Sequence, residues 1–323
     1  MVLKFNPILK SIMWGGEKIA PYKGVSTEQK QIGESWELSG VAGNESTVSE
    51  GKYAGCTIPE LLEKMGTQLV GEKNYERFGK EFPILIKFID ALDDLSIQVH
   101  PNDDMSMARH NKKGKTEMWY VVDAAPGAKL RVGFSEQVTS DEYAAHIANN
   151  TILDVLKEYD VSAGDLFFLP AGRIHSIGAG CFIAEIQQTS DVTYRIYDFC
   201  RKDKDGNERE LHTELSKEAI DYTLYDDYKS QYEDVKNRAV ELASCPYFTT
   251  DLLNLDKPMT IEPAKFDSFV SVMCLGGSAT LVDSDGESSQ IKQGETLLVS
   301  AATASFEIQP QGEVKLLTSI VKS

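Results

Sequence analysis

A succession of short apolar runs, each bounded by glycine, proline or aspartate, limits the folds open to this chain. Runs of about four to eight residues, often with alternating apolar and polar side chains, are typical of β-strands. The runs in the first part of the chain are 82–89, 95–99, 117–122, 128–134, 165–170 and 181–188. Similar runs return near the C-terminus, at 247–255, 269–282, 295–309 and 314–321. Strands this short and evenly spaced predict antiparallel sandwiches or barrels of the jelly-roll type.

Helical periodicity is limited to a few segments. It is found in 58–65, in 140–159 with Ser140 as the N-cap, and in 215–224. The polar, tyrosine-rich stretch that follows is interpreted as a helical or irregular connector. We therefore expect a mainly β protein with an N-terminal unit, a connector and a C-terminal unit, at 1–225, 226–244 and 245–323.

Charge and cysteine usage exclude several classes of protein. The formal net charge of −17 argues against a non-specific binder of nucleic acid or anionic membranes, while the basic cluster 109–115 is compatible with a small anionic substrate. Five widely spaced cysteines without a CxxC pair suit a reducing cytosol and offer no thiolate metal site. Residues 1–16 lack the apolar core of a signal peptide, and no run approaches the ~20 apolar residues of a membrane span. We expect a cytoplasmic protein of enzyme size.

A glutamine and a histidine stand two residues apart in the sequence SIQVHP, residues 96–101. In an extended strand, residues i and i+2 point to the same face, so Gln98 and His100 are expected side by side. Two interpretations are open at this point: a polar pair on the wet face of a half-buried strand, or two members of a metal shell.

Two further residues can complete such a shell. His175 follows an apolar strand and a tight turn in GDLFFLPAGRIHSIG, which places its imidazole at the mouth of a barrel. Glu117 begins the strong strand EMWYVV. One amide oxygen, two imidazole nitrogens and one carboxylate suit Zn²⁺ with open positions for water or substrate, although Mn²⁺, Fe²⁺ or Co²⁺ also fit. Because the amide is neutral, the metal is left more electrophilic than a second carboxylate would leave it.

The motifs resemble those of a known family. The spacing from Gly164 to His175 matches the second motif of cupin barrels, and Gln98 and His100 stand where cupins carry His-x-His. LSIQVHPND, KTEMWYVV, PAGRIHSIGAG and SDVTYRIYDF resemble the signature blocks of type I mannose-6-phosphate isomerases, the zinc-dependent cupin family. WGG and IGESWELSG, nearer the N-terminus, resemble the opening blocks of its short bacterial members. The resemblance covers about residues 1–215, with a longer spacing between the two central ligands than most cupins have and with Ala179 in place of a frequent asparagine.

The resemblance implies a fold, a cofactor and a reaction. The fold is two cupin-type jelly-roll barrels or sandwiches, and the cofactor is one zinc ion per chain. The implied ligands are Gln98, His100, Glu117 and His175. The reaction interconverts mannose 6-phosphate and fructose 6-phosphate by metal-assisted proton transfer between C2 and C1 through an enediolate. The implied partner is therefore a small sugar phosphate.

Charged residues near the motifs are the candidate catalytic and binding groups. Arg195 matches the active-site arginine of the family, and its forked guanidinium suits enediolate or phosphate oxygens. Glu185 and Lys115 match polar residues of the family's pocket, so they are candidates for proton transfer or substrate positioning; the alternative is an ordinary strand carboxylate and a solvated loop charge. Lys87 lies in an otherwise apolar strand, where a buried unpaired lysine is costly, so it either snorkels to solvent or faces a polar cavity. The resemblance favours the cavity.

Four weaker candidates concern substrate binding. Trp36 and Glu37 offer a stacking face and a hydroxyl acceptor for a sugar, and Lys112 and Lys113 offer cations for a phosphate. A tryptophan is more often a simple core residue, and a charge run such as that of Lys112 and Lys113 is usually a solvated loop.

Two other functions compete with the isomerase interpretation. The first is another metal-dependent cupin enzyme, either a different sugar-phosphate isomerase or a dioxygenase; a dioxygenase would more often show two histidines and one carboxylate for Fe²⁺ without the glutamine. The second, a non-catalytic sugar-binding cupin, would not require Arg195, Lys115 and Glu185 beside a complete shell. A fused guanylyltransferase is disfavoured because no Gly-rich nucleotide-binding segment is present. No histidine follows His212, so we expect the C-terminal unit to be a cupin-like unit without a metal site.

Overall fold

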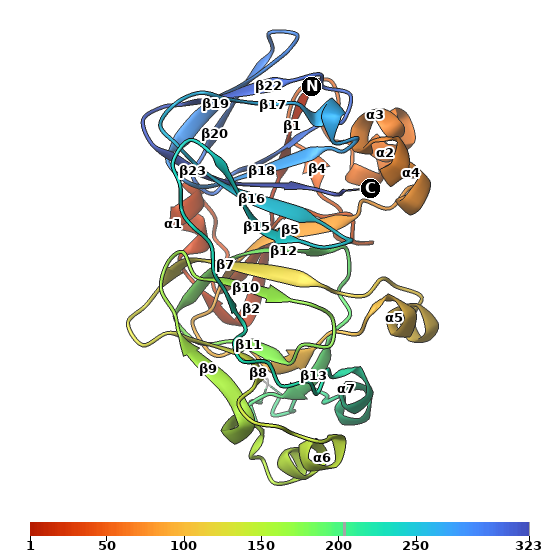
Figure 1. The fold of residues 1–323 in the computed structure, drawn as a ribbon, viewed down its shortest axis with the longest axis vertical. Helices are drawn as coiled ribbons and strands as arrows, with labels where there is room; N and C mark the ends of the chain where they lie inside the picture. The colour runs from red at the N-terminus through yellow and green to blue at the C-terminus, as the bar shows by residue number, and fades with distance from the viewer. Residues whose placement is uncertain (203–204, 323) are drawn as a thin grey trace.

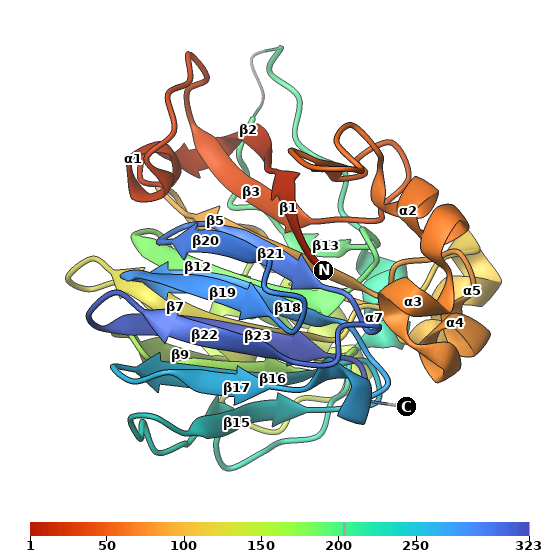
Figure 2. The same cartoon turned by 90° about the horizontal axis from the view of Figure 1, so that it is seen from above.

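The structure is a computed structural model in which residues 1–202 and 205–322 are described. In these ranges the chain forms four antiparallel sheets, and most of the short helices lie at one end of the strands (Figures 1 and 2). The prediction of a mainly β, sandwich-like fold with few helices is confirmed.

Two sheets contain most of the strands from the first two thirds of the sequence. The large N-terminal sheet has the strand order β14 (Lys229–Ser230), β10 (Leu166–Leu169), β7 (Glu117–Ala124), β12 (Cys181–Gln188), β5 (Ile84–Asp90), β3 (Ile32–Leu38) and β2 (Ile8–Gly16). The small N-terminal sheet has the order β13 (Tyr194–Tyr197), β6 (Ile97–Val99), β11 (His175–Ile177), β8 (Lys129–Phe134) and β9 (Leu156–Asp160). Their strands include all six apolar runs predicted between residues 82 and 188.

Two further sheets contain the C-terminal strands. The large C-terminal sheet has the order β15 (Ala239–Ser244), β16 (Thr249–Leu255), β23 (Val314–Ile320), β18 (Val270–Gly276), β21 (Thr296–Val299), β1 (Val2–Asn6) and β4 (Thr47–Val48). The small C-terminal sheet has the order β17 (Met259–Ile261), β22 (Phe306–Pro310), β19 (Ser278–Asp283) and β20 (Ser288–Lys292).

Strand pairing does not follow the linear division of the chain. β1, at the N-terminus, pairs with β21 through Val2↔Val299 and lies within the large C-terminal sheet. β14 and β15 fall inside or overlap the predicted connector 226–244, which therefore contributes strands to two sheets. The division at residues 225 and 245 stays a prediction, and the pairing shows that both halves of the chain contribute to the large C-terminal sheet.

The helices are short. They are α1 (Ile19–Lys23), α2 (Ile58–Met65), α3 (Thr67–Val70), α4 (Glu72–Phe78), α5 (Asp103–His110), α6 (Ser140–Ala148) and α7 (Thr213–Ala219), with 3-10 turns η1 (Ile152–Val155) and η2 (Pro263–Lys265). α2 matches its predicted range. In the described ranges no helix has the length and apolar character needed to cross a membrane.

The helix expected over 140–159 is wrong beyond Ala148. Asn150 has a φ of 56°, which takes the chain out of the helical region, and residues 156–160 pair with β8 as β9. The N-cap is Thr139, which forms a capping box with Glu142, and not Ser140. The third predicted helix, over 215–224, is shifted: α7 ends at Ala219 because Ile220 is extended.

The large N-terminal sheet is buried on both faces. One face packs against the large C-terminal sheet in an apolar core that joins Phe88 and Ala184 with Leu252 and Met273. The other face looks toward the small N-terminal sheet. All seven residues of β5 are buried as a result, so the strand is a continuous apolar run in which Lys87 and the terminal Asp90 are the exceptions. The space between the large and small N-terminal sheets holds the site described next.

Candidate metal centre and active site

Three buried side chains, His100, Glu117 and His175, come together between the large and small N-terminal sheets. His100 follows β6, Glu117 begins β7 and His175 begins β11, so each lies at the end of a strand. His100 Nε2 is 3.5 Å from Glu117 Oε2, and His175 Nε2 is 3.3 Å from Glu117 Oε1. One potential ligand atom from each residue lies within 4.8 Å of the other two. Side chains in this arrangement can converge on a single metal ion.

The main chain orients both imidazoles. His100 Nδ1 lies 2.9 Å from the carbonyl oxygen of Val192, and His175 Nδ1 lies 2.7 Å from that of Arg173. A carbonyl only accepts, so each Nδ1 carries the hydrogen and each Nε2 presents its lone pair to the centre. Burial and the Lys115 ammonium lower the pKa of both histidines, that of His175 to about 3. Both rings are therefore neutral, as metal-ligating imidazoles are.

Glu117 is the residue whose environment calls for a cation. Its side chain is fully buried; the Lys115 ammonium lies 2.7 Å from Oε2, while Oε1 has no hydrogen-bond donor within the described residues. Burial and the nearby charge of Glu185 raise the pKa of Glu117 to about 7. A buried carboxylate oxygen without a donor is costly. A divalent cation held with His100 and His175 would satisfy Oε1, so the residues present fit a metal ion.

β6 places Gln98 between His175 and Arg195. Gln98 pairs with His175 on β11 and with Arg195 on β13, so the three side chains lie on one face of the small N-terminal sheet. Gln98 Nε2 is 3.3 Å from His175 Nε2, and a 180° rotation of the amide brings its oxygen to the same place. Arg195 is half-buried; its Nη1 donates to the carbonyl oxygen of Glu210 at 2.9 Å, and its Nε has no partner among the described residues. The guanidinium thus keeps a donor available beside the cluster.

A polar row crosses the face of the large N-terminal sheet that looks toward the cluster. Trp119, Glu185, Lys87 and Trp36 are register partners on β7, β12, β5 and β3. Lys87 Nζ lies 3.0 Å from Glu185 Oε1 and 3.5 Å from Glu34 Oε1, and Trp119 Nε1 donates to Glu185 Oε2 at 2.7 Å. Lys87 is therefore buried among paired polar groups and does not snorkel to solvent, while its role in a substrate cavity stays a prediction.

Neighbouring charges keep the buried pair of Lys87 and Glu185 ionised. Burial opposes the charge on Lys87, but Glu185 and Glu34 outweigh it and raise the pKa of the lysine. Burial likewise opposes the charge on Glu185, but Lys87 and Lys115 lower the pKa of that carboxyl. The polar row therefore presents fixed charges to the space between the two sheets.

Lys115 connects the polar row to the metal cluster. Its ammonium lies 2.7 Å from Glu117 Oε2, 3.0 Å from His100 Nε2 and 3.9 Å from Glu185 Oε1. The residue is 5% exposed, so these charges interact with little screening by water. The structure thus brings Gln98, His100, Lys115, Glu117, His175 and Arg195 into one neighbourhood, and Lys87 and Glu185 into the row beside it.

The structure does not bring all predicted binding residues there. Glu37 lies on the opposite face of β3, where its Oε1 accepts from Ser35 at 2.5 Å and pairs with buried Lys23 at 2.6 Å. Lys112 pairs with Asp191 at 2.6 Å on the surface, where both side chains are exposed. Lys113 is half-buried and lies 3.7 Å from Glu81. Trp36 ends the polar row, with Lys87 Nζ 5.9 Å from its ring centroid.

Trp119, which is part of the polar row, and Glu34, which pairs with Lys87 of that row, were not predicted. Glu34 pairs with Lys87 and accepts a hydrogen bond from Trp36 Nε1 at 2.6 Å, and Trp119 orients Glu185. The alternation of strand side chains could have found both. Glu34 is two residues from Trp36, and Trp119 is two residues from Glu117, so each shares a face with a predicted residue. The same rule places Glu37 on the face opposite Trp36.

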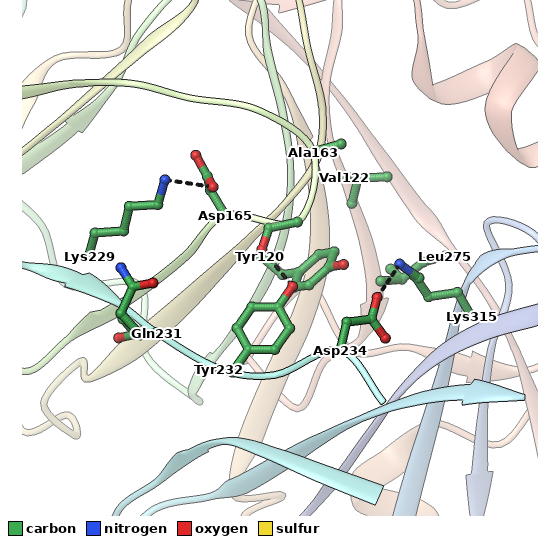
Figure 3. A pocket seen from close by; sticks show the side chains of 12 residues that line it. Tyr120, Val122, Ala163, Asp165, Lys229, Gln231, Tyr232, Asp234, Leu275 and Lys315 are labelled. Atoms are coloured by element: carbon green, nitrogen blue, oxygen red, sulfur yellow. Dashed lines mark hydrogen bonds and ion pairs between the residues drawn. The ribbon is translucent and has the colours of Figure 1, made fainter. Parts of the chain in front are cut away.

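A cavity of about 480 Å³ lies on the other face of β7 and is separate from this cluster (Figure 3). Tyr120 and Tyr232 stand in its middle, between the ion pairs of Lys229 with Asp165, at 2.7 Å, and Lys315 with Asp234, at 3.1 Å. None of the predicted site residues lines it. Because Tyr120 and Trp119 are adjacent in β7, the cavity and the metal cluster lie on opposite sides of one sheet.

The comparisons with known proteins agree with this geometry. Residues 2–124 match the model of the phosphomannose isomerase type I catalytic domain, and residues 239–321 match that of the mannose-6-phosphate isomerase cupin domain. The chain is 32% identical to mannose-6-phosphate isomerase ManA of Bacillus subtilis over 96% of both chains. It is 30% identical to the mannose-6-phosphate isomerase of Streptococcus mutans, over 95% of this chain and 94% of that protein.

The fold comparison leads to the same family. The crystal structure of the mannose 6-phosphate isomerase from Bacillus subtilis superposes with a TM-score of 0.88, at 27% identity, over 98% of this chain and 99% of the other. Sequence and fold therefore agree along nearly the whole length of the chain. The chain belongs to the type I mannose-6-phosphate isomerase family of cupin enzymes.

Proposed function

We propose that the chain interconverts mannose 6-phosphate and fructose 6-phosphate, with one zinc ion held by Gln98, His100, Glu117 and His175. The observation that carries the proposal is the buried carboxylate of Glu117, whose Oε1 has no hydrogen-bond donor within the described residues and which is flanked by two neutral imidazoles whose Nε2 atoms face it. Imidazole, carboxylate and amide ligands suit Zn²⁺ with an open position for substrate. The cysteine pattern supports a cytoplasmic location for this activity.

The reaction requires two catalytic functions of the site. A proton must move between C2 and C1 of the sugar, and the negative charge that develops on the enediolate oxygens must be stabilised. When bound, the zinc ion would polarise the substrate oxygens or orient them. Proton transfer and substrate positioning are assigned to the side chains around it.

Glu185 and Lys115 are the proposed proton-transfer and positioning pair. Lys115 Nζ lies 3.9 Å from Glu185 Oε1, so a sugar carbon or hydroxyl bound beside the cluster can be reached from both side chains. Lys87 Nζ, 3.0 Å from the same Oε1, keeps Glu185 ionised. Trp36 offers an apolar wall at the end of the row. This division of roles explains why three charged groups are kept in the interior of a β-sandwich.

Arg195 is proposed to bind enediolate or phosphate oxygens. It shares a face with the proposed ligand Gln98, its Nε lacks a partner within the described part of the chain, and its charge is permanent. Lys112 and Lys113 pair with acidic residues at the surface, so we leave them out of the proposed substrate site.

A coupled assay tests the proposal. Purified protein is incubated with mannose 6-phosphate, and fructose 6-phosphate is detected through a coupling enzyme before chelation, after chelation and after addition of Zn²⁺. Turnover should be lost to the chelator and return with the metal. Other hexose and pentose phosphates serve as control substrates. Absence of turnover with mannose 6-phosphate after zinc is restored would refute the proposed function.

A further inference from the structure

The backbone of Arg195 has an unusual partner. β13 is an edge strand of the small N-terminal sheet, so its outer main-chain groups have no neighbouring strand among the described residues. Arg195 nevertheless has both groups satisfied by a single residue. Its N–H donates to His212 Nδ1 at 3.0 Å, and its carbonyl oxygen accepts from the His212 N–H at 2.7 Å. At this position, His212 makes the two backbone hydrogen bonds that a neighbouring strand would otherwise make.

The side chain of Arg195 is held by the same segment. Its Nη1 donates to the carbonyl oxygen of Glu210 at 2.9 Å, two residues before His212. Within residues 210–212, Glu210 therefore binds the guanidinium of Arg195, and His212 binds its backbone. The opposite side of Arg195 faces Gln98 on β6. A change at His212 would consequently alter the placement of the guanidinium relative to the metal cluster.

The position of His212 in α7 makes its ring available for this contact. His212 is the N-cap of α7, where a side-chain oxygen commonly accepts from an N–H of the first turn. The His212 side chain makes no such cap and instead points back to β13, with its ring 6.1 Å from that of Tyr194. Burial lowers the pKa of His212, which keeps Nδ1 free to accept. Helix formation alone therefore does not account for a histidine here.

We propose that His212 is a positioning residue for Arg195, with Nδ1 fixing the edge-strand backbone that aims the guanidinium into the site. The inference rests on the proposed function, in which Arg195 contacts substrate oxygens. His212 itself touches no reacting atom. It acts through Arg195, and small displacements of a charged group in a site reduce turnover strongly.

Three single variants test the hydrogen bond. His212→Ala removes the acceptor, and His212→Asn restores an oxygen near the position of Nδ1. The control is His146→Ala on α6, because His146 also makes a local Nδ1 contact, 2.9 Å from Thr151 Oγ1, but is not part of the site. We expect His212→Ala to lower kcat about tenfold or more with unchanged zinc content. His212→Asn should recover most of that loss, and His146→Ala should match the wild type.

A double-mutant cycle separates positioning from a general structural role. If His212 acts through Arg195, adding His212→Ala to Arg195→Ala should cause no further loss of kcat. Additive losses would overturn the inference, as would a wild-type kcat in His212→Ala or an Asn variant no better than the Ala variant. The proposed function fails in a different way, because the wild-type protein itself would then not turn over mannose 6-phosphate.

Discussion

Two residues of the site, His100 and Arg195, separate metal binding from turnover. His100 Nε2 points at the shared centre, so His100→Ala should abolish binding of stoichiometric zinc, and with it activity. Arg195 has a free donor beside the cluster but no place in the ligand set, so Arg195→Ala should keep the zinc and lose turnover by about a hundredfold or more. Metal analysis after dialysis and steady-state kinetics measure both. Full kcat in Arg195→Ala would show that its assigned role is wrong.

The buried ion pair of Lys87 and Glu185 leads to a prediction about stability. Both residues are buried, at 6% and 2% exposure, and their charged groups lie 3.0 Å apart. Removing one partner leaves a buried charge without full compensation, so Lys87→Met should lower the free energy of unfolding by about 3 kcal/mol. The matched control is Lys80→Met, which breaks an exposed ion pair with Glu63. It should leave denaturant unfolding close to the wild type. Similar losses in the two variants would contradict a buried, compensated pair.

The turn between β10 and β11 depends on a glycine with a positive φ, Gly172. Gly172 has a φ of +90°, its N–H donates to the His100 carbonyl at 2.8 Å, and an added Cβ would lie 3.0 Å from the Ala219 carbonyl oxygen. Gly127 has a similar φ of +80° but open space around it. Both Ala variants incur backbone strain of about 1–2 kcal/mol, and Gly172→Ala adds a clash of about 1 kcal/mol more.

Gly172→Ala should also weaken zinc binding. The N–H of Gly172, three residues before His175, donates to the carbonyl oxygen of His100, so the turn connects the backbones of the two proposed ligands. Chemical denaturation and zinc titration of the two glycine variants compare these effects directly. Equal stability and equal zinc affinity in Gly172→Ala and Gly127→Ala would show that the turn does not position the ligands.

Alternation along strands accounts for most of what could be predicted from the sequence about these elements. It predicted that Gln98 and His100 share a face, and in the structure Gln98 lies 3.3 Å from His175, close to the His100 and Glu117 cluster. The polar surroundings of Lys87 were favoured by the family resemblance and not by alternation. Applied consistently, alternation would also have excluded Glu37 and found Glu34 and Trp119. The failure at 140–159 has a different cause. Residues 156–160 have no strong strand signal of their own and become β9 by pairing with β8, a contact between separate segments that local periodicity does not contain.

At the scale of the whole molecule, the two parts of the chain depend on each other. β1 lies in the large C-terminal sheet, and one apolar core includes Phe88 of β5 together with Leu252 of β16 and Met273 of β18. The order of apolar runs along the sequence does not reveal such pairing, because partners such as Val2 and Val299 come from opposite ends of the chain.

Truncation tests this interdependence. A fragment of residues 1–238 retains the metal cluster but exposes the face of the large N-terminal sheet that carries Phe88. We expect the fragment to aggregate or to unfold without a cooperative transition, whereas the full chain unfolds in one transition. Calorimetry and light scattering provide the comparison. A soluble fragment with a sharp transition and bound zinc would show that the N-terminal part folds independently.

The decisive experiment is a zinc titration of metal-depleted protein, followed by the rate of conversion of mannose 6-phosphate to fructose 6-phosphate. We expect negligible turnover without metal, a linear rise with added Zn²⁺, and a plateau at one equivalent per chain. Glu117→Gln, which keeps the shape of the side chain but removes its charge, should not reach that plateau at one equivalent. Full turnover in the metal-depleted protein, or none at any zinc concentration, would contradict a zinc-dependent isomerase built on this cluster.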